Sequence, residues 1–342
     1  MSTNRTDIRL ALPSKGRLAE EALAFLSQAG LRVDKPNPRQ LQATIPALPG
    51  LSVLFQRAGD IAVSVRDGSV DLGLTGWDAV AERGGADGAV LRLIPSLGFG
   101  HCRLLAIVPE AWTEVRCMRD LAAVAASQGA PLRVATKFPE LTRAFFAQHG
   151  LGEPRLIQPE GTLEVAPTIG YADLICDLVS SGTTMRDNRL KALEDGLIVD
   201  SEACLIAHRQ SLKRRPEVLA LARQLIEFID AHLRAAANVA IFANMRGASP
   251  EAIAARMATQ KVIGGLQGPT VSPIVHPARS DWFAVHIVVR KDRLGQAISE
   301  LRAIGGSGVV VAPVTYIFEE EPEACRAMVE ALGRDETASR EG

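Results

Sequence analysis

Residues 172–184 read Ala-Asp-Leu-Ile-Cys-Asp-Leu-Val-Ser-Ser-Gly-Thr-Thr, an apolar run that passes into a string of small residues. The apolar part predicts a buried strand, and we expect a helix from about Arg186 to Glu194 after the loop. Short hydroxyl and glycine residues at such a turn let several backbone N–H groups converge on one anion. The stretch therefore predicts either a phosphate cradle or an ordinary serine- and threonine-rich turn that caps a helix.

Two carboxylates belong to this stretch. Asp177 ends the strand, where it could accept hydrogen bonds from two ribose hydroxyls. Asp173 lies four residues earlier in a Gly-x-x-Asp-Leu frame that begins at Gly170 and recurs at Gly68, where it holds Asp71. A carboxylate present in both frames is better explained as the acceptor of a strand-start hydrogen bond than as a catalytic group. We therefore assign the ribose contact to Asp177 in preference to Asp173.

The recurring frame belongs to one of two sequence patterns that occur in both halves of the chain. Residues 8–30 and 132–150 both predict a strand, a connector with a lysine and a helix. Residues 60–76 and 164–179 both predict a helix, a glycine stop and a strand, the first helix with Asp60 as its N-cap. We expect two similar α/β lobes, each with a parallel sheet, although chance similarity between βα units would give the same pattern.

Two such lobes would form a cleft, and ligands of open α/β sheets bind at the carboxyl ends of the strands. Lys15, Thr75, Lys137 and Asp177 fall at such ends. The turn Lys15-Gly16-Arg17 offers two cations around a glycine, which suits a triphosphate or pyrophosphate, or else is a solvated turn. Lys137 has the same two interpretations. Weaker cleft-lining candidates are Arg57, Thr75, Gly76 and Asp78.

The C-terminal third has a different pattern. Strands are expected at 238–245, 271–276, 282–289 and 309–315, and helices at 250–260 and 293–304. The order βαββαβ is typical of the ferredoxin-like fold, and glycine-rich turns separate the elements. A last helix is expected at about 322–333, followed by a polar tail, 334–342, that we expect to be disordered.

Composition excludes several classes of protein. The chain has 342 residues and a formal net charge of −1, which argues against a broad nucleic-acid surface. No apolar run approaches the ~20 residues of a membrane helix, and no secretory signal is expected at the N-terminus. Five cysteines without a CxxC spacing fit a reducing, cytoplasmic environment. The histidines show no spacing typical of a metal site.

Taken together, the motifs resemble those of the ATP phosphoribosyltransferases of histidine biosynthesis, in their long form. The matching segments are LPSKGRL (12–18), QRAGDI (56–61), DLGLTGWD (71–78), LGFGHCRL (97–104), ATKFP (135–139), EVAP (164–167), DLVSSGTT (177–184), GPTVSP (268–273) and 301–313. The resemblance implies a two-lobed α/β catalytic core like the periplasmic binding proteins and a C-terminal ferredoxin-like regulatory domain. The implied segments are 1–105 with a return at 203–235 (lobe I), 106–202 (lobe II), 236–318 (regulatory domain) and 319–342 (helix and tail).

The resemblance also implies the reaction. Adenine N1 of ATP would attack phosphoribosyl pyrophosphate, giving phosphoribosyl-ATP and pyrophosphate with Mg²⁺, in a homo-oligomer between dimer and hexamer that histidine inhibits. Asp177, Lys15 and Arg17 would be catalytic. Phosphoribosyl pyrophosphate would be bound by Glu164, Asp173, Asp177, Ser180, Ser181, Gly182, Thr183 and Thr184. ATP would be bound by Lys15, Gly16, Arg17, Arg57, Thr75, Gly76, Asp78 and Lys137, and no metal ligands are assigned.

Two alternatives remain at this stage. Two lobes also suit a solute-binding protein, against which the absent signal peptide and the phosphate loop both count. A catalytically inactive regulatory relative is the second, because Met185 and Arg186 depart from the family pattern beside the loop.

Overall fold

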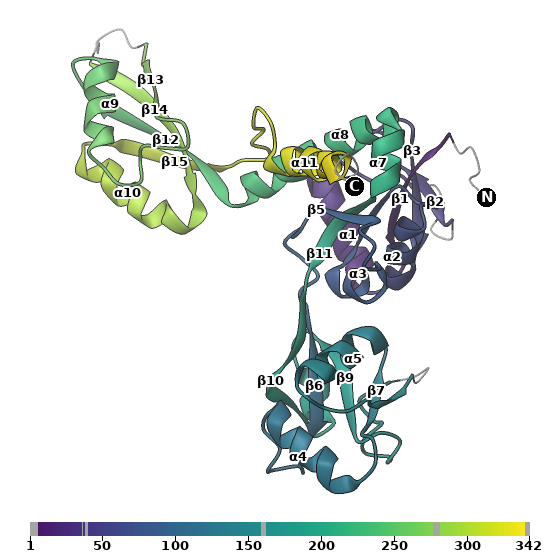
Figure 1. The fold of residues 1–342 in the computed structure, drawn as a ribbon. Helices are drawn as coiled ribbons and strands as arrows, with labels where there is room; N and C mark the ends of the chain where they lie inside the picture. The colour runs from purple at the N-terminus through teal and green to yellow at the C-terminus, as the bar shows by residue number, and fades with distance from the viewer. Residues whose placement is uncertain (1–5, 36, 38–39, 159–161, 276–280, 339–342) are drawn as a thin grey trace. The chain divides into compact units, whose positions relative to one another are not determined.

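The computed structural model describes residues 6–35, 37, 40–158, 162–275 and 281–338. The chain forms two compact units. One comprises Met1–Ser27, Leu31–Gln224 and Ala324–Gly342, and the other comprises Gln28–Gly30 and Leu225–Glu323. The first unit holds two sheets, which with their helices we call lobe I and lobe II, and the second holds one (Figure 1). The finer boundaries expected from the sequence stay a prediction.

Lobe I is built on a six-stranded sheet in the order β2-β3-β1-β4-β11-β5. Its strands are β1 (Ile8–Pro13), β2 (Gln42–Thr44), β3 (Leu51–Gln56), β4 (Leu72–Gly76), β5 (Val90–Ile94) and β11 (Ala203–His208). The helices of this part of the chain are α1 (Arg17–Gln28), α2 (Ala58–Arg66), α3 (Trp77–Arg83) and α7 (Arg209–Arg214). Helix α8 (Pro216–Ala236) follows α7. The apolar side chains of α2 pack on one face of β1 and β11 through Ile61, Ala62 and Val65.

Lobe II is built on a five-stranded sheet in the order β10-β6-β9-β7-β8. Its strands are β6 (Cys102–Pro109), β7 (Arg133–Thr136), β8 (Arg155–Ile157), β9 (Leu174–Val179) and β10 (Leu190–Ser201). Its helices are α4 (Met118–Gln128), α5 (Pro139–Gln148) and α6 (Thr183–Asp187). Helices α4 and α5 pack on one face through Met118, Leu121 and Phe146. The segment 163–172 covers the other face through Leu163, Ala166 and Ala172.

The two sheets share one strand order. Lobe I reads β3-β1-β4-β11-β5 and lobe II reads β8-β7-β9-β6-β10. In both cases three parallel strands come first, the fourth strand is antiparallel to them, and the fifth is antiparallel to the fourth. The expectation of two similar lobes is confirmed, whereas the expectation of wholly parallel sheets is wrong. Antiparallel pairs arise because β6 and β11 enter their sheets directly from the other lobe, without the crossover helix that a parallel connection needs.

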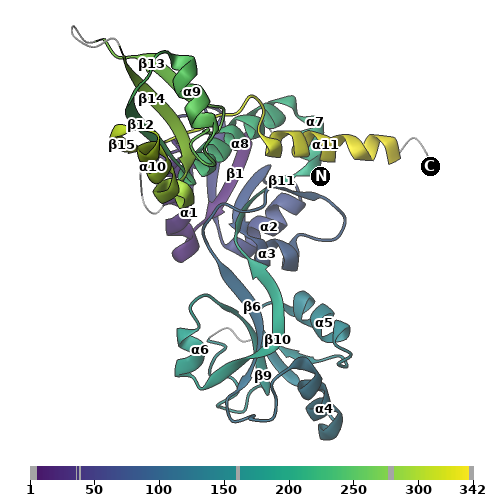
Figure 2. The same ribbon diagram turned by 90° about the vertical axis from the view of Figure 1, so that its left-hand side faces the viewer.

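These crossings intertwine the chain. Strand β6 follows β5 of lobe I in sequence but pairs with β9 and β10 of lobe II. Strand β11 follows β10 of lobe II but pairs with β4 and β5 of lobe I. Figures 1 and 2 both show β6 and β10 running side by side. Each lobe is therefore completed by a strand that the other lobe delivers.

The second unit contains the expected βαββαβ domain. Its elements are β12 (Asn238–Arg246), α9 (Pro250–Ala258), β13 (Thr270–Pro273), β14 (Trp282–Arg290), α10 (Leu294–Ala303) and β15 (Ser307–Pro313). The sheet order β13-β14-β12-β15 is that of the ferredoxin-like fold. Alternate residues of β12 and β14 pack against both helices, so α9 and α10 cover the same face (Figure 2). Phe242 and His286 stack on the other face.

Four local expectations are wrong. The expected helix 164–169 is a run of turns, because Pro167 removes a backbone donor in its middle. The expected helix 186–194 is replaced by the short α6 and by β10, whose backbone pairs with β6. Arg57, not Asp60, is the N-cap residue of α2, and Asp60 lies in the first turn. Helix α11 (Glu323–Ala338) continues into the tail expected to be disordered.

His276, expected to end a strand, lies outside the described residues, as does the end of the tail, 339–342. In the part of the chain that is described, no helix combines the length and the apolar character needed to span a bilayer.

Candidate active site

A cavity of about 170 Å³ opens in lobe II where β9 ends and α6 begins. Six of the residues expected to bind phosphoribosyl pyrophosphate line it, namely Glu164, Asp177, Ser180, Ser181, Gly182 and Thr184. Thr183 lies beside them, its hydroxyl 3.1 Å from that of Ser181. The structure therefore brings the contiguous loop, the strand carboxylate and the distant Glu164 to one place.

Asp177 is a half-buried carboxylate on the face of β9 that segment 163–172 covers. Strand alternation places it between Ile175 and Val179, at a position where the neighbouring residues are apolar. Burial raises the pKa of Asp177 to about 6, and the charge of Glu164 adds to this effect. A hydrogen bond of 2.8 Å from the Leu178 N–H to Oδ1 and the nearby ammonium of Lys137 oppose it.

Gly182 shapes the loop between β9 and α6. It is the N-cap residue of α6 and has φ +73°, a left-handed conformation that suits glycine. A Cβ built there would lie 3.4 Å from Nη1 of Arg186 and 3.7 Å from Cγ1 of Val179, which are ordinary contacts. The glycine is thus required by the backbone conformation more than by the space around it, and Arg186 places a guanidinium close to the loop.

Arg17 links lobe I to this loop. It is the first residue of α1, and its Nη2 donates to the Ser180 hydroxyl and to the His101 carbonyl, both at 3.1 Å. Lys15 and Gly16 precede it, Lys15 exposed and Gly16 with φ +79°. The turn after β1 therefore supplies at least one cation to the 180–184 loop of the other lobe.

Asp173 lies outside the cavity, at the opposite end of β9. Its Oδ2 accepts the backbone N–H of Arg133 at 2.7 Å, and its Oδ1 pairs with Nη2 of the same residue at 2.7 Å. Burial acts to raise the pKa of Asp173, but the hydrogen bonds and charge of Arg133 hold it below its usual range. Asp71 accepts the backbone N–H of Arg9 at 2.9 Å in the same way. The strand-start role expected for both carboxylates is confirmed, and a role of Asp173 in binding stays a prediction.

Comparison with known proteins identifies the family. A family model described as ATP phosphoribosyltransferase matches residues 57–231, and one described as HisG, C-terminal domain, matches residues 235–316. The chloroplastic ATP phosphoribosyltransferase 2 of Arabidopsis thaliana is 40% identical over 336 residues, covering 96% of this chain and 81% of the relative. The chain belongs to the ATP phosphoribosyltransferase family.

Two further matches agree with this assignment. The ATP phosphoribosyltransferase of Nitrobacter winogradskyi is 36% identical over 321 residues, covering 92% of this chain and 95% of the relative. Among solved structures, the ATP phosphoribosyl transferase (HisG:HisZ) complex from Thermotoga maritima matches with a TM-score of 0.50 and 23% identity. That match covers 65% of this chain and 98% of the other, and it supports the fold.

Some of the residues expected to bind ATP already have partners within the protein. Thr75 is fully buried, and its hydroxyl donates to the Ala58 carbonyl at 3.0 Å. Asp78 is buried and accepts from the Ser201 hydroxyl at 2.6 Å. Gly76 has no room for a side chain because a Cβ would collide with Asp78. Arg57 and Lys137 are exposed at the starts of α2 and α5, so contact of all five with ATP stays a prediction.

Sequence reasoning missed residues that meet only in space. Ser201 pairs with Asp78 across 123 positions of sequence, and no local pattern predicts this pairing. Glu82 reaches the start of α5 in the other lobe. Met185 lines the cavity, although the sequence shows it only as a departure from the family pattern.

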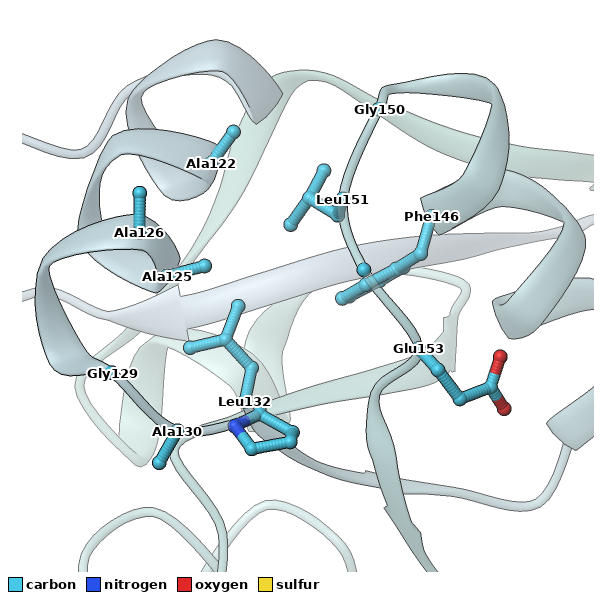
Figure 3. Close-up of a pocket in the computed structure, with 12 residues that line it drawn as sticks. Ala122, Ala125, Ala126, Gly129, Ala130, Leu132, Phe146, Gly150, Leu151 and Glu153 are labelled. Atoms are coloured by element: carbon cyan, nitrogen blue, oxygen red, sulfur yellow. The ribbon is translucent and has the colours of Figure 1, made fainter.

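A larger pocket of about 540 Å³ in lobe II does not belong to the transferase site. It lies between α4 and the end of α5 and is lined mainly by alanine, glycine and leucine. Figure 3 shows Leu132 and Leu151 pointing toward the helix that carries Ala122, Ala125 and Ala126, while the Glu153 carboxylate extends away from it. Such a lining offers an anion no side-chain donors, so the smaller polar cavity is the candidate active site.

Proposed function

We propose that this chain transfers the phosphoribosyl group of phosphoribosyl pyrophosphate to N1 of ATP, releasing pyrophosphate, in the first step of histidine biosynthesis. One observation carries the proposal. Asp177, Glu164 and four residues of the 180–184 loop line one cavity in lobe II, and Arg17 of lobe I donates to Ser180 in that loop. Family membership supports the same reaction.

The reaction depends more on positioning the substrates and stabilising charge than on a general base. As pyrophosphate leaves C1 of the ribose, positive charge develops on the ring, while adenine N1 is already nucleophilic. Asp177 would accept hydrogen bonds from the ribose hydroxyls and hold the ring against the loop. Groups fixed in place before the reaction stabilise such developing charge without reorganisation.

Backbone donors and cations would bind the phosphates. The residues 180–184 have small side chains, and Gly182, with φ +73°, turns the chain within the loop, so that backbone N–H groups of this loop would bind the phosphates. Arg17 already reaches this loop, and Lys15 and Lys137 add positive charge at the ends of β1 and β7. These cations offset the negative charge of the leaving pyrophosphate and of the ATP triphosphate.

The donor set fits Mg²⁺ delivered with the substrate. Among the described residues no group of three or more His, Cys, Asp or Glu side chains could cage a metal. Mg²⁺ commonly takes one or two carboxylates together with substrate phosphates and waters, and Glu164 and Asp177 provide two carboxylates in one cavity. When bound, the ion would neutralise part of the charge on the pyrophosphate.

The second unit would supply regulation. The C-terminal family model matches residues 235–316, where the ferredoxin-like domain lies, and we propose that histidine binds this domain and inhibits transfer. Such coupling requires different histidine affinities in two conformations, typically by 1–3 kcal/mol. We further propose a homo-oligomer between dimer and hexamer, and a cytoplasmic location in keeping with the five scattered cysteines, which have no CxxC spacing.

The test is absorbance-monitored formation of phosphoribosyl-ATP with Mg²⁺, with and without histidine. We expect turnover and inhibition by histidine at millimolar concentration or below. Binding of phosphoribosyl pyrophosphate in isothermal titration without turnover would instead indicate an inactive relative. If phosphoribosyl pyrophosphate did not bind, the solute-binding alternative would be favoured. Hydrogen exchange with histidine should show protection in 236–318, and protection confined to the lobes would refute the placement of the histidine site. Light scattering measures the oligomer.

A further inference from the structure

Helix α5 of lobe II starts without a cap of its own. The N-cap position is taken by Phe138, whose side chain makes no capping hydrogen bond, and Pro139 follows it. The first N–H groups of a helix have no partner within the helix, so they need one from elsewhere. The local sequence therefore leaves the N–H groups of Glu140 and Leu141 to be satisfied by a distant residue.

Glu82 of lobe I satisfies both. Its Oε1 accepts the N–H of Glu140 and its Oε2 accepts the N–H of Leu141, each at 3.0 Å. Burial raises the pKa of Glu82, and these two backbone hydrogen bonds act in the opposite direction by stabilising the carboxylate. One carboxylate of α3 thus replaces the missing N-cap of a helix in the other lobe.

Helix α3 has a second attachment one turn away. Asp78 accepts from the hydroxyl of Ser201, the last residue of β10, at 2.6 Å, and the Asp78 N–H donates to the same hydroxyl at 2.9 Å. The two carboxylates lie four positions apart and therefore on one face of the helix. Through them α3 holds both the end of β10 and the start of α5.

The start of α5 belongs to the turn that carries Lys137. Thr136 fixes the other side of this turn, because its hydroxyl accepts the Phe138 N–H at 3.0 Å. The ammonium of Lys137 lowers the pKa of Asp177, so the charge of this turn reaches the cavity. Displacement of the turn would therefore change the electrostatics beside Asp177.

We propose that Glu82 is a positioning residue. It caps α5 across the lobe boundary and so fixes the position of the Lys137 turn relative to lobe I. The inference deepens the proposed transferase function and rests on it. Glu82 does not touch the cavity in lobe II. It acts on turnover, where groups of both lobes must be aligned, rather than on binding of phosphoribosyl pyrophosphate to lobe II alone.

The test compares Glu82→Ala, Glu82→Gln and Glu140→Gln in the full-length chain. Glu140 is the matched control, an exposed carboxylate at the same junction that pairs with Arg143 and does not cap the helix. We expect Glu82→Ala to lower kcat about tenfold and to change the Kd of phosphoribosyl pyrophosphate by less than twofold. Glu82→Gln, which retains one acceptor oxygen, should lie between Glu82→Ala and wild type, and Glu140→Gln should match wild type.

Hydrogen exchange separates this inference from the proposed function. The amides of Glu140 and Leu141 should exchange faster in Glu82→Ala and remain protected in Glu140→Gln, whatever reaction the protein catalyses. Faster exchange with unchanged kcat would overturn the positioning role and leave a purely structural cap. Unchanged exchange would overturn the cap itself. Absence of transferase activity in the wild type would refute the proposed function, on which the positioning role rests, while exchange would still report on the cap.

Discussion

Lobe I and lobe II begin equivalent strands with the same carboxylate and then differ four residues later. Asp71 and Asp173 precede β4 and β9, and each accepts a backbone N–H from the neighbouring parallel strand. Four positions on, lobe I has Thr75, fully buried with its hydroxyl bonded to Ala58, and lobe II has Asp177, facing a cavity. The Gly-x-x-Asp-Leu frame is present in both lobes, whereas the carboxylate four positions after its aspartate is present in lobe II and not in lobe I.

The covering segment explains the difference. In lobe I, α2 packs on this face of the sheet and its first turn takes the Thr75 hydroxyl. In lobe II, the same face is covered by the turns of 163–172, which leave space beneath Asp177 and bring Glu164 to its edge. One scaffold therefore serves as support or as binding site, depending on what closes the carboxyl end of the strands.

The strand-start carboxylates should differ most in stability. Asp71→Ala removes a fully buried acceptor and leaves Arg215, itself largely buried, without that partner, so we expect a loss of about 3 kcal/mol or more in the free energy of unfolding. Asp173→Ala removes a more exposed pair with Arg133 and one backbone acceptor, so a loss of about 1–2 kcal/mol is expected. Urea unfolding measures both. Equal losses would show that the two frames are energetically alike.

The residues four positions on should differ in activity. Asp177→Asn should lower kcat/KM roughly 10- to 150-fold, since a hydrogen bond to a charged group contributes about 1.5–3 kcal/mol, with a melting temperature close to wild type. Thr75→Val should lower stability, because the Ala58 carbonyl loses its donor, and should leave kcat/KM within a few-fold. Phosphoribosyl-ATP formation and thermal melts check both. Activity lost in Thr75→Val without loss of stability would mean that lobe I also contributes chemistry at this position.

Substitution of Gly182 in the loop tests whether a change in lobe II affects the binding of one substrate or of both. Gly182→Ala forces an L-residue to φ +73°, which costs about 1–2 kcal/mol. We expect the free loop to relax away from this conformation, so that binding of phosphoribosyl pyrophosphate must restore it and its affinity falls about 5- to 30-fold. ATP affinity should change little if ATP contacts the lobe I cations. Isothermal titration with each ligand decides, and equal losses would point to a general disturbance of both lobes.

The raised pKa of Asp177 predicts a pH dependence that Thr75 does not have. If the ionised carboxylate is the active form, kcat/KM should rise as the pH increases through about 6 and then reach a plateau, and Asp177→Asn should remove this rise. The stability that the protonated carboxyl contributes is complete below about pH 4 and is lost as the pH rises through about 6, because the folded state holds this proton more tightly. A pH profile without a limb near 6 in the wild type would contradict this.

Local patterns predicted much of this molecule. The strands and helices of 238–315 follow from alternation, helical spacing and glycine turns, which act within about ten residues. The Gly-x-x-Asp-Leu frames predicted their hydrogen bonds because the acceptor sits at a fixed place before its strand. The same local reasoning failed at 186–194, where pairing of β10 with β6 determines the conformation and local helical spacing does not.

By itself, then, the sequence determined the lobed α/β pattern, the C-terminal domain and the composition of the 177–184 loop, since each depends on contiguous residues. Only the tertiary structure decided which distant groups meet that loop or its surroundings: Arg17 on Ser180, Glu82 on α5 and Ser201 on Asp78. These contacts join residues 58 to 163 positions apart, and strands that cross between the lobes bring them together. The order of strands in a sheet sets such distances, and hydrogen bonds between side chains so far apart leave no periodic trace in the chain.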